Sequence, residues 1–174
     1  MQESATLTEE VNHGLSMLIR PAKQSDIPAV LPMVGKICAL HETWDGAKYG
    51  FLPNPAQRYE WWLSKVVKSD RAVFLVAEDE TKALLAGFLV ATIEREIPIY
   101  RLKEYAFIQD LWVELEYRRS GVARQLVTQT IEQFQKMGVV QIRLDTAAIN
   151  ETARKLFSEC GFRPSTVEML IELE

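Results

Sequence analysis

Residues 104–124 read Glu-Tyr-Ala-Phe-Ile-Gln-Asp-Leu-Trp-Val-Glu-Leu-Glu-Tyr-Arg-Arg-Ser-Gly-Val-Ala-Arg. The first half is a β-rich apolar run, which breaks at residues 118–121 before apolar residues resume at helical spacing. A strand that passes through a small-residue turn directly into a helix leaves main-chain N–H groups unpaired at the positive end of the helix dipole. Such a turn is suited to bind phosphate.

The composition is that of one globular domain. The chain has 174 residues, of which 48% are hydrophobic and 25% charged, and its net charge is −4. A negative chain lacks the basic field that non-specific nucleic-acid binding requires, so we expect no nucleic-acid partner. The apolar run at 83–93 is shorter than the roughly 18 residues of a membrane span, so we expect no membrane segment.

The N-terminus has neither the basic region nor the apolar region of a signal peptide, which favours a cytoplasmic location. Residues 1–15 are polar and aperiodic, and we expect a loose tail there, followed by a single domain over 16–174. Two cysteines, Cys38 and Cys160, are too few for a metal cluster, and we expect buried free thiols and no metal.

Hydrophobic periodicity predicts an α/β (α+β) fold in the order β-α-α-β-β-β-α-β-α-β. A strand, a helix and a strand over 104–145 require a right-handed crossover, whereas 72–113 is typical of a meander, so the central sheet should be mixed. We expect about six to seven strands flanked by about four helices. The predicted strands cover 16–20, 72–78, 84–97, 104–113, 139–145 and 167–173, and the predicted helices cover 27–40, 55–68, 120–137 and 150–160.

The turn alone does not decide between kinds of phosphate site. No Lys-Ser or Lys-Thr follows the glycine, as a P-loop requires, and no further glycines stand at dinucleotide spacing. An isolated Arg-x-x-Gly-x-Ala could also be a helix start with solvated arginines. About 27 residues later, however, the chain reads Asn150-Glu-Thr-Ala153-Arg-Lys-Leu156-Phe157 and ends this helix at Gly161-Phe162.

Together the two motifs resemble the GCN5-related N-acetyltransferase (GNAT) superfamily. Its acyl-CoA loop reads Arg/Gln-x-x-Gly-x-Gly/Ala, and its later helix reads Asn-x-x-Ala-x-x-Leu-Tyr before Gly-Phe. The resemblance covers 17–173 and implies acetyl-CoA as co-substrate. It also implies that the CoA pyrophosphate is held by the main chain of Ser120, Gly121, Val122 and Ala123, with Arg118, Arg119 and Arg124 nearby. Gly121 would then keep a side chain from crowding the phosphate.

The resemblance implies that the pantetheine arm of CoA binds at the end of the strand predicted over 104–113. Leu111, Trp112 and Val113 would offer main-chain groups to it, with the Leu111 N–H as the oxyanion donor. Asn150 would reach the pantetheine, although it could instead simply cap its helix. Phe157, in place of the superfamily's usual tyrosine, would also contact the CoA.

Proton transfer is where the chain departs from the superfamily. Gln109 stands where relatives resembling polyamine acetyltransferases have glutamate, and Phe157 cannot act as an acid. Solvent could carry the protons, other residues could stand in, or the chain could be a poor catalyst. Asp110 is the first candidate base because burial would raise its pKa, although it could also be a structural carboxylate.

Substrate selection is expected between the first two helices, which wall the acceptor site in relatives. His41, just past the first predicted helix, could titrate near neutral pH. Glu42 and Asp45 could attract an ammonium group, and Trp44 could provide a cation–π wall, although surface acids need no special role.

We therefore predict an N-acetyltransferase that acetylates a primary amine of a small cationic molecule by direct attack in a ternary complex. One alternative is an acyl-CoA-binding sensor or scaffold with weak or no transfer. Another is a protein N-terminal or lysine acetyltransferase. The last predicted strand would leave an exposed sheet edge, so a homodimer is a candidate assembly.

Overall fold

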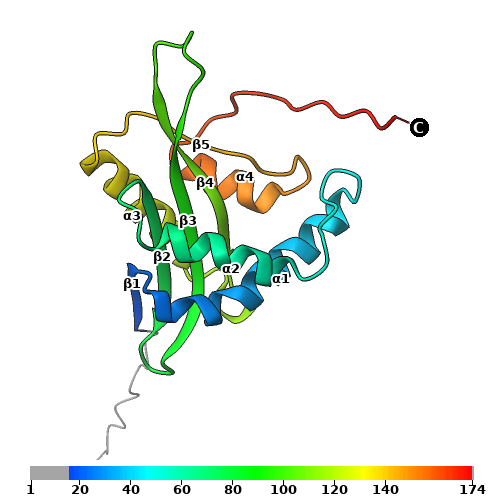
Figure 1. Ribbon diagram of the computed structural model, residues 1–174. Coiled ribbons are helices and arrows are strands. Elements are labelled where there is room, and N and C mark those ends of the chain that lie inside the picture. The colour runs from blue at the N-terminus through cyan, green and yellow to red at the C-terminus, as the bar shows by residue number, and fades with distance from the viewer. Residues whose placement is uncertain (1–15, 174) are drawn as a thin grey trace, which may run out of the picture.

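The computed structural model describes residues 16–173, and the tail expected over 1–15 lies outside them. A five-stranded mixed sheet forms its centre, in the order β1-β2-β3-β4-β5. The first four strands form an antiparallel meander, and β5 returns parallel to β4 (Figure 1). The strands are β1 (Met17–Pro21), β2 (Ala72–Asp79), β3 (Leu84–Arg95), β4 (Glu104–Val113) and β5 (Ile142–Leu144).

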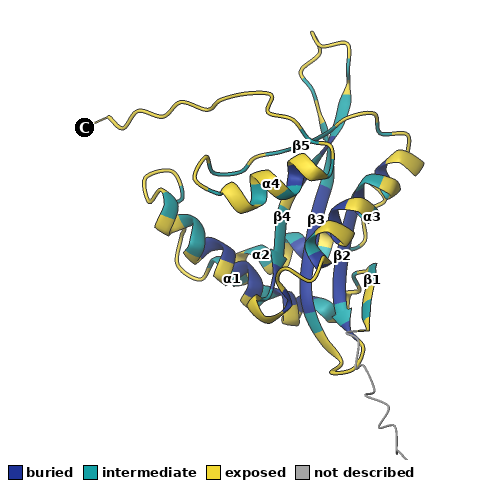
Figure 2. Ribbon diagram, turned by 180° about the vertical axis from the view of Figure 1, so that it is seen from behind, coloured by how far each residue is buried: buried dark blue, intermediate teal, exposed yellow. Residues whose placement is uncertain are grey.

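Helices cover both faces of the sheet (Figures 1 and 2). One face carries α1 (Ile27–Trp44) and α2 (Pro55–Val66), and the other carries α3 (Val122–Lys136) and α4 (Glu151–Glu159). Successive side chains of β3 point to opposite faces of the sheet and so contribute to both hydrophobic layers. Phe88 packs on the α1 and α2 side, and Leu89 packs on the α3 and α4 side. Short 3₁₀ turns, η1 (Gln24–Asp26) and η2 (Leu115–Tyr117), precede α1 and α3.

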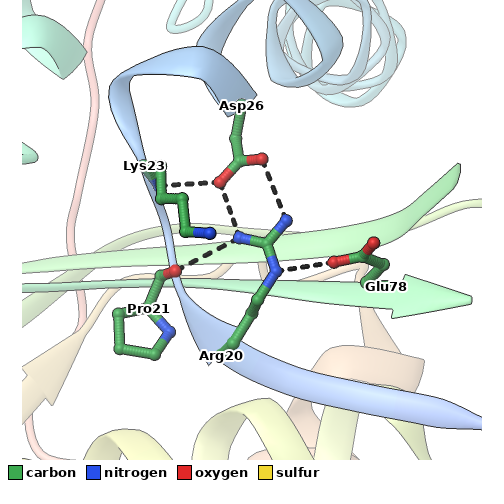
Figure 3. A network of polar contacts seen from close by, with 5 residues as sticks. All are labelled: Arg20, Pro21, Lys23, Asp26 and Glu78. Carbon is green, nitrogen blue, oxygen red and sulfur yellow. Dashed lines mark hydrogen bonds and ion pairs between the residues drawn. The ribbon is translucent and has the colours of Figure 1, made fainter. Parts of the chain in front are cut away.

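Arg20 ties the first strand to the rest of the domain (Figure 3). Its guanidinium donates to both carboxylate oxygens of Asp26 at 2.7 and 3.0 Å and to Glu78 of β2 at 2.6 Å. The bond from Arg20 lowers the pKa of Asp26, and Asp26 in turn raises that of Arg20. Because Asp26 also accepts from the Lys23 N–H, the network fixes where α1 begins.

Two predicted strands differ from the structure by more than two residues, and the strand expected at 84–97 ends at Arg95. The strand expected at 139–145 is limited to 142–144, because pairing with β4 involves only three residues. Residues 167–173 are not a strand, because no neighbouring strand of the described chain lies beside them to pair with. The sheet of residues 16–173 therefore has five strands, not six to seven.

The first helix is longer than expected. It continues to Trp44, where the Asp45 N–H donates to the His41 carbonyl at 3.2 Å and the Asp45 backbone then becomes extended. His41 consequently lies in the last turn of α1 and not beyond it. Cys38 is buried and Cys160 half-buried, and both are free thiols as expected.

Candidate active site

A β-bulge interrupts β4 at Gln109. Val90 of β3 pairs with Asp110 and Ala91 pairs with Ile108, so Gln109 has no partner in the ladder. One extra residue reverses the faces of a strand from that point onward. Ile108 therefore packs in the α3 and α4 layer, whereas Asp110, two residues later, points toward α1 and α2.

Beyond the bulge, β4 and β5 separate. β5 pairs only with residues 106–108, so no described strand lies along the β5 side of residues 109–113. The Glu114 N–H donates to the Ala86 carbonyl on the β3 side at 2.8 Å. Because N–H groups alternate along a strand, those of Leu111 and Val113 point to the open side. The bulge thus leaves main-chain donors facing the separation between β4 and β5.

The turn before α3 presents further main-chain donors. Arg119 and Gly121 have positive φ angles of 65° and 87°. The first intrahelical bond of α3 is donated by the Gln125 N–H to the Gly121 carbonyl, and α3 has no side-chain cap and no acidic residue in its first turn. A fifteen-residue helix whose first N–H groups lack a cap is suited to bind an anion.

Gly121 is needed for its backbone conformation. A Cβ there would meet no protein atom within 4 Å, but the φ of 87° is strained for any residue with a side chain. The predicted crowding of a bound phosphate by a side chain at this position stays a prediction.

The arginines of the turn are positioned differently from one another. Arg118 donates from Nε to the Val113 carbonyl at 2.9 Å, and its guanidinium lies 4.7 Å from the Trp112 ring centroid. Arg124 forms an ion pair with Glu159 of α4. Arg119 is exposed. Arg118 therefore braces the strand end, and its predicted contact with phosphate would have to come from its remaining N–H groups.

A buried polar cluster beneath the turn has no signal in the sequence. Asp79, at the end of β2, is fully buried and accepts from the Thr81 hydroxyl at 2.5 Å and from the Tyr117 hydroxyl at 2.9 Å. These bonds, that from Thr81 first, lower the pKa of Asp79 to about 2. The Tyr117 carbonyl in turn accepts from the Ser120 hydroxyl at 2.6 Å. The cluster connects β2 to the turn, 38 residues away along the chain.

Asp110 lies in a second polar cluster, on the α1 and α2 side. The Tyr59 hydroxyl of α2 donates to the Asp110 carboxylate. Burial raises the pKa of Asp110, although the bond from Tyr59 and the nearby His41 oppose the rise. Burial also lowers the pKa of His41, against the charge of Asp110. The sequence placed Tyr59 on a helix near the acceptor but gave no sign of its bond to Asp110.

Aromatic side chains extend this cluster. The His41 ring lies 5.0 Å from that of Trp44 and 4.7 Å from that of Tyr49. Both predicted acids are exposed: Glu42 accepts from the Phe51 N–H at 3.4 Å, and Asp45 accepts from the Ala47 and Lys48 N–H groups at 3.1 Å. Asp45 therefore stabilises its own turn.

The two predicted residues of α4 have structural partners. The Asn150 side-chain oxygen accepts from the Ala153 N–H at 3.1 Å, so the helix-cap alternative is confirmed, and its amide group remains to donate. Phe157 is buried, with its ring 5.5 Å from that of Phe162. Their predicted contacts with CoA stay predictions.

The described residues contain no group of three or more metal-ligating side chains. Within residues 16–173, no helix is both long and apolar enough to cross a membrane.

Comparison with known proteins identifies relatives of this fold and sequence. A family model described as "Acetyltransferase (GNAT) family" matches residues 37–162. An uncharacterized N-acetyltransferase of Bacillus subtilis, YycN, is 33% identical over 85 residues, which are 49% of this chain and 52% of that protein. The chain spans about half the length of the curated relatives it matches first.

Solved structures show the same fold at low identity. A single-substitution mutant of the BH1408 protein of Bacillus halodurans has a TM-score of 0.78 and 20% identity, covering 90% of this chain and 99% of that one. The enzyme AAC(6')-Iy, in complex with the bisubstrate analog CoA-S-monomethyl-acetylneamine, has a TM-score of 0.65 and 16% identity, covering 91% and 98%.

Proposed function

Because the chain belongs to the acetyltransferase (GNAT) family, we propose that it is an N-acetyltransferase that uses acetyl-CoA to acetylate a primary amine of a small cationic molecule. The bulge at Gln109 carries this proposal, because it sets a half-buried carboxylate, Asp110, next to a free main-chain donor, Leu111. Attack of an amine on a thioester needs a group that takes the amine proton and a donor to the carbonyl oxygen.

The donor side fits acetyl-CoA, which supplies an acetyl group activated as a thioester. The N–H groups of residues 120–123, at the uncapped start of α3, hold the pyrophosphate, and the exposed Arg119 adds positive charge, whereas the charge of Arg124 is balanced by Glu159. Residues 111–113 bind the pantetheine arm through their main chain on the open side of β4. The CoA-containing ligand of the structural neighbour AAC(6')-Iy supports the choice of co-substrate.

The reaction is a direct transfer within a ternary complex. The amine nitrogen bonds to the acetyl carbon as the carbon–sulfur bond breaks, and Asp110 accepts the amine proton. The Leu111 N–H stabilises the carbonyl oxygen as negative charge develops on it. Phe157 has no proton to give, so the departing thiolate takes its proton from solvent. Cys160 forms no covalent intermediate.

The acceptor side favours a cation. His41 and Trp44, near the end of α1, lie close to one another in an aromatic cluster, and Asp110 lies near enough to His41 for its charge to act on the imidazole. Glu42 is exposed in the same turn of the helix. An aromatic wall with a carboxylate beside it attracts an ammonium group both electrostatically and through cation–π contact.

Release of the CoA thiol tests the proposal. Purified protein and acetyl-CoA would be incubated with polyamines, amino sugars, aminoglycosides, amino acids and peptides, with no acceptor as the control. We expect release stimulated by one or more small cationic amines. Tight binding of acetyl-CoA without stimulated release would favour the sensor alternative, and release with peptides alone would favour a protein acetyltransferase.

A further inference from the structure

A chain of polar contacts runs from α1 to the turn before α3. Lys36, on α1, donates from Nζ to both carboxylate oxygens of Glu114, at 2.7 and 2.8 Å. Glu114 also accepts from the Trp112 indole N–H at 3.2 Å, and the Arg118 guanidinium lies over the Trp112 ring, 4.7 Å from its centroid. The helix on the proposed acceptor side is therefore connected, through the end of β4, to the turn at which the proposed pyrophosphate site begins.

The bulge in β4 brings these side chains to one face of the sheet. Asp110, Trp112 and Glu114 alternate along the chain beyond the bulge, and all three point toward the α1 and α2 side. Leu111 and Val113, between them, pack on the α3 and α4 side. The row thus begins at the proposed base and ends at a second carboxylate, that of Glu114, next to the turn.

The Glu114 carboxylate is a negative charge close to a proposed site for phosphates. Its side chain is only 17% exposed. Through the indole, this carboxylate lies within about 10 Å of the Arg118 guanidinium, which is one Debye length at an ionic strength of about 0.1 M. Salt therefore screens the charge only in part, and an unpaired carboxylate here would repel the phosphates of acetyl-CoA. Among residues 16–173, Lys36 is the one cation that forms an ion pair with Glu114.

The pair between Lys36 and Glu114 has little to contribute to folding. The Lys36 side chain is 52% exposed, and an ion pair with so exposed a partner adds little stability. Arg118 does not take the place of Lys36, because its Nε donates to the Val113 carbonyl at 2.9 Å and its guanidinium rests on the Trp112 ring. The position of Lys36 is better explained by the charge that it neutralises.

We propose that Lys36 sets the affinity for acetyl-CoA from the acceptor side of the sheet, by neutralising Glu114 beside the phosphate-binding turn. Lys36 acts through Glu114 and not by touching the co-substrate, so it is a positioning residue and not a catalytic one. The inference rests on the co-substrate site of the proposed function. It adds to that site a residue of α1, a helix on the opposite face of the sheet from α3.

Three variants of the full chain test the inference. Lys36→Met removes the cation and leaves Glu114 unpaired. Adding Glu114→Gln to that variant removes the unpaired charge and keeps an oxygen that accepts from the Trp112 indole. Arg71→Met is the matched control, because it changes the net charge equally but removes the partner of Glu104, at the opposite end of β4. Circular dichroism and the unfolding temperature would check that all three variants fold.

Calorimetry would measure the dissociation constant of acetyl-CoA without any amine, so the measurement does not require transfer. We expect Lys36→Met to raise this constant about threefold to tenfold, and the increase to shrink as salt is added. The double variant Lys36→Met/Glu114→Gln should bind acetyl-CoA as the natural chain does, and Arg71→Met should leave the affinity unchanged. A purely structural ion pair would instead lower the unfolding temperature and would not be rescued by a neutral glutamine.

Four results would count against the inference. Unchanged affinity in Lys36→Met would overturn it, as would a loss that Arg71→Met reproduces, because net charge alone would then explain the effect. A loss that Glu114→Gln fails to restore would show that Lys36 acts by another route. A natural chain that does not bind acetyl-CoA would overturn the inference together with the proposed function. Binding without amine-stimulated release, in contrast, would contradict the proposed transfer alone, and the affinities would still decide the role of Lys36.

Discussion

Replacing Asp110 with asparagine should lower activity and raise stability together. Asparagine has nearly the same shape and keeps an oxygen that accepts the Tyr59 hydroxyl, but it cannot take a proton from the acceptor amine. Loss of a positioned general base should reduce kcat by about 10²–10⁴-fold. The rate of CoA thiol release at saturating acetyl-CoA and amine measures this loss.

The gain in stability follows from the burial of the carboxylate. Desolvation of this half-buried ionised group costs about 2–4 kcal/mol, whereas exchanging a charged for a neutral hydrogen bond to Tyr59 loses only about 1 kcal/mol. We therefore expect Asp110→Asn to raise the free energy of unfolding by roughly 1–3 kcal/mol, or the unfolding temperature by roughly 2–10 °C. Urea unfolding and calorimetry measure these quantities.

The direction of the Asp110 pKa shift determines how the stability gain of Asp110→Asn depends on pH. Burial holds the pKa of Asp110 above its unfolded value of about 3.9, so the folded state binds the proton more tightly. The stability of the natural chain therefore falls as pH rises between the unfolded and the folded pKa. The advantage of Asp110→Asn should be complete above the folded pKa and absent below the unfolded one.

Tyr59→Phe is the matched control, because it removes the donor and keeps the carboxylate. The pKa of Asp110 should rise further, so the ascending limb of the kcat profile should move to higher pH while stability falls. Asp110→Asn with kcat within tenfold of the natural value would refute the assignment of Asp110 as base. An Asp110→Asn variant less stable than the natural chain would show that the protein fully compensates the buried charge.

Four further variants address the proposed co-substrate site and the absence of a covalent intermediate. Tyr117→Phe removes the hydroxyl that donates to the Asp79 carboxylate. It should raise KM for acetyl-CoA several-fold but leave KM for acetyl-pantetheine, which lacks the pyrophosphate, unchanged. Equal increases in the two KM values would contradict a role of Tyr117 at the turn. The same variant should unfold at a higher pH on acidification, because the lost bond helps to hold the pKa of Asp79 near 2. Gly121→Ala should lower the free energy of unfolding by about 1–2 kcal/mol and raise KM for acetyl-CoA. Gly138, at the other end of α3, also has a positive φ, of 78°. Gly138→Ala is therefore the control, which should lose as much stability without a change in KM. Cys160→Ala should keep its turnover, and loss of turnover with folding and acetyl-CoA binding intact would indicate a covalent intermediate.

Local sequence patterns predicted the helices and most strands well. They predicted less well the features that depend on contact with a distant part of the chain. The turn at 118–121 could be identified because glycine and its spacing to the next helix are local properties, and β4 has the predicted bounds of 104–113. Residues 167–173 have a strand pattern, but alternation does not specify a partner, and the described chain provides none. The bond between Tyr117 and Asp79 joins residues 38 apart, for which neither periodicity nor a motif gives a signal.

The bulge changes the meaning of Gln109. In the sequence this residue stood where a base was expected, and its amide suggested an impaired enzyme. In the structure the Gln109 side chain is exposed and donates to the Thr92 hydroxyl at 3.1 Å, while its backbone is the extra residue of the bulge. That insertion turns Asp110 toward Tyr59 and directs the Leu111 N–H to the open side of β4. A glutamine performs this backbone role as well as a glutamate would, so the residue at 109 does not by itself argue against transfer, and in the proposed mechanism proton removal would depend on Asp110.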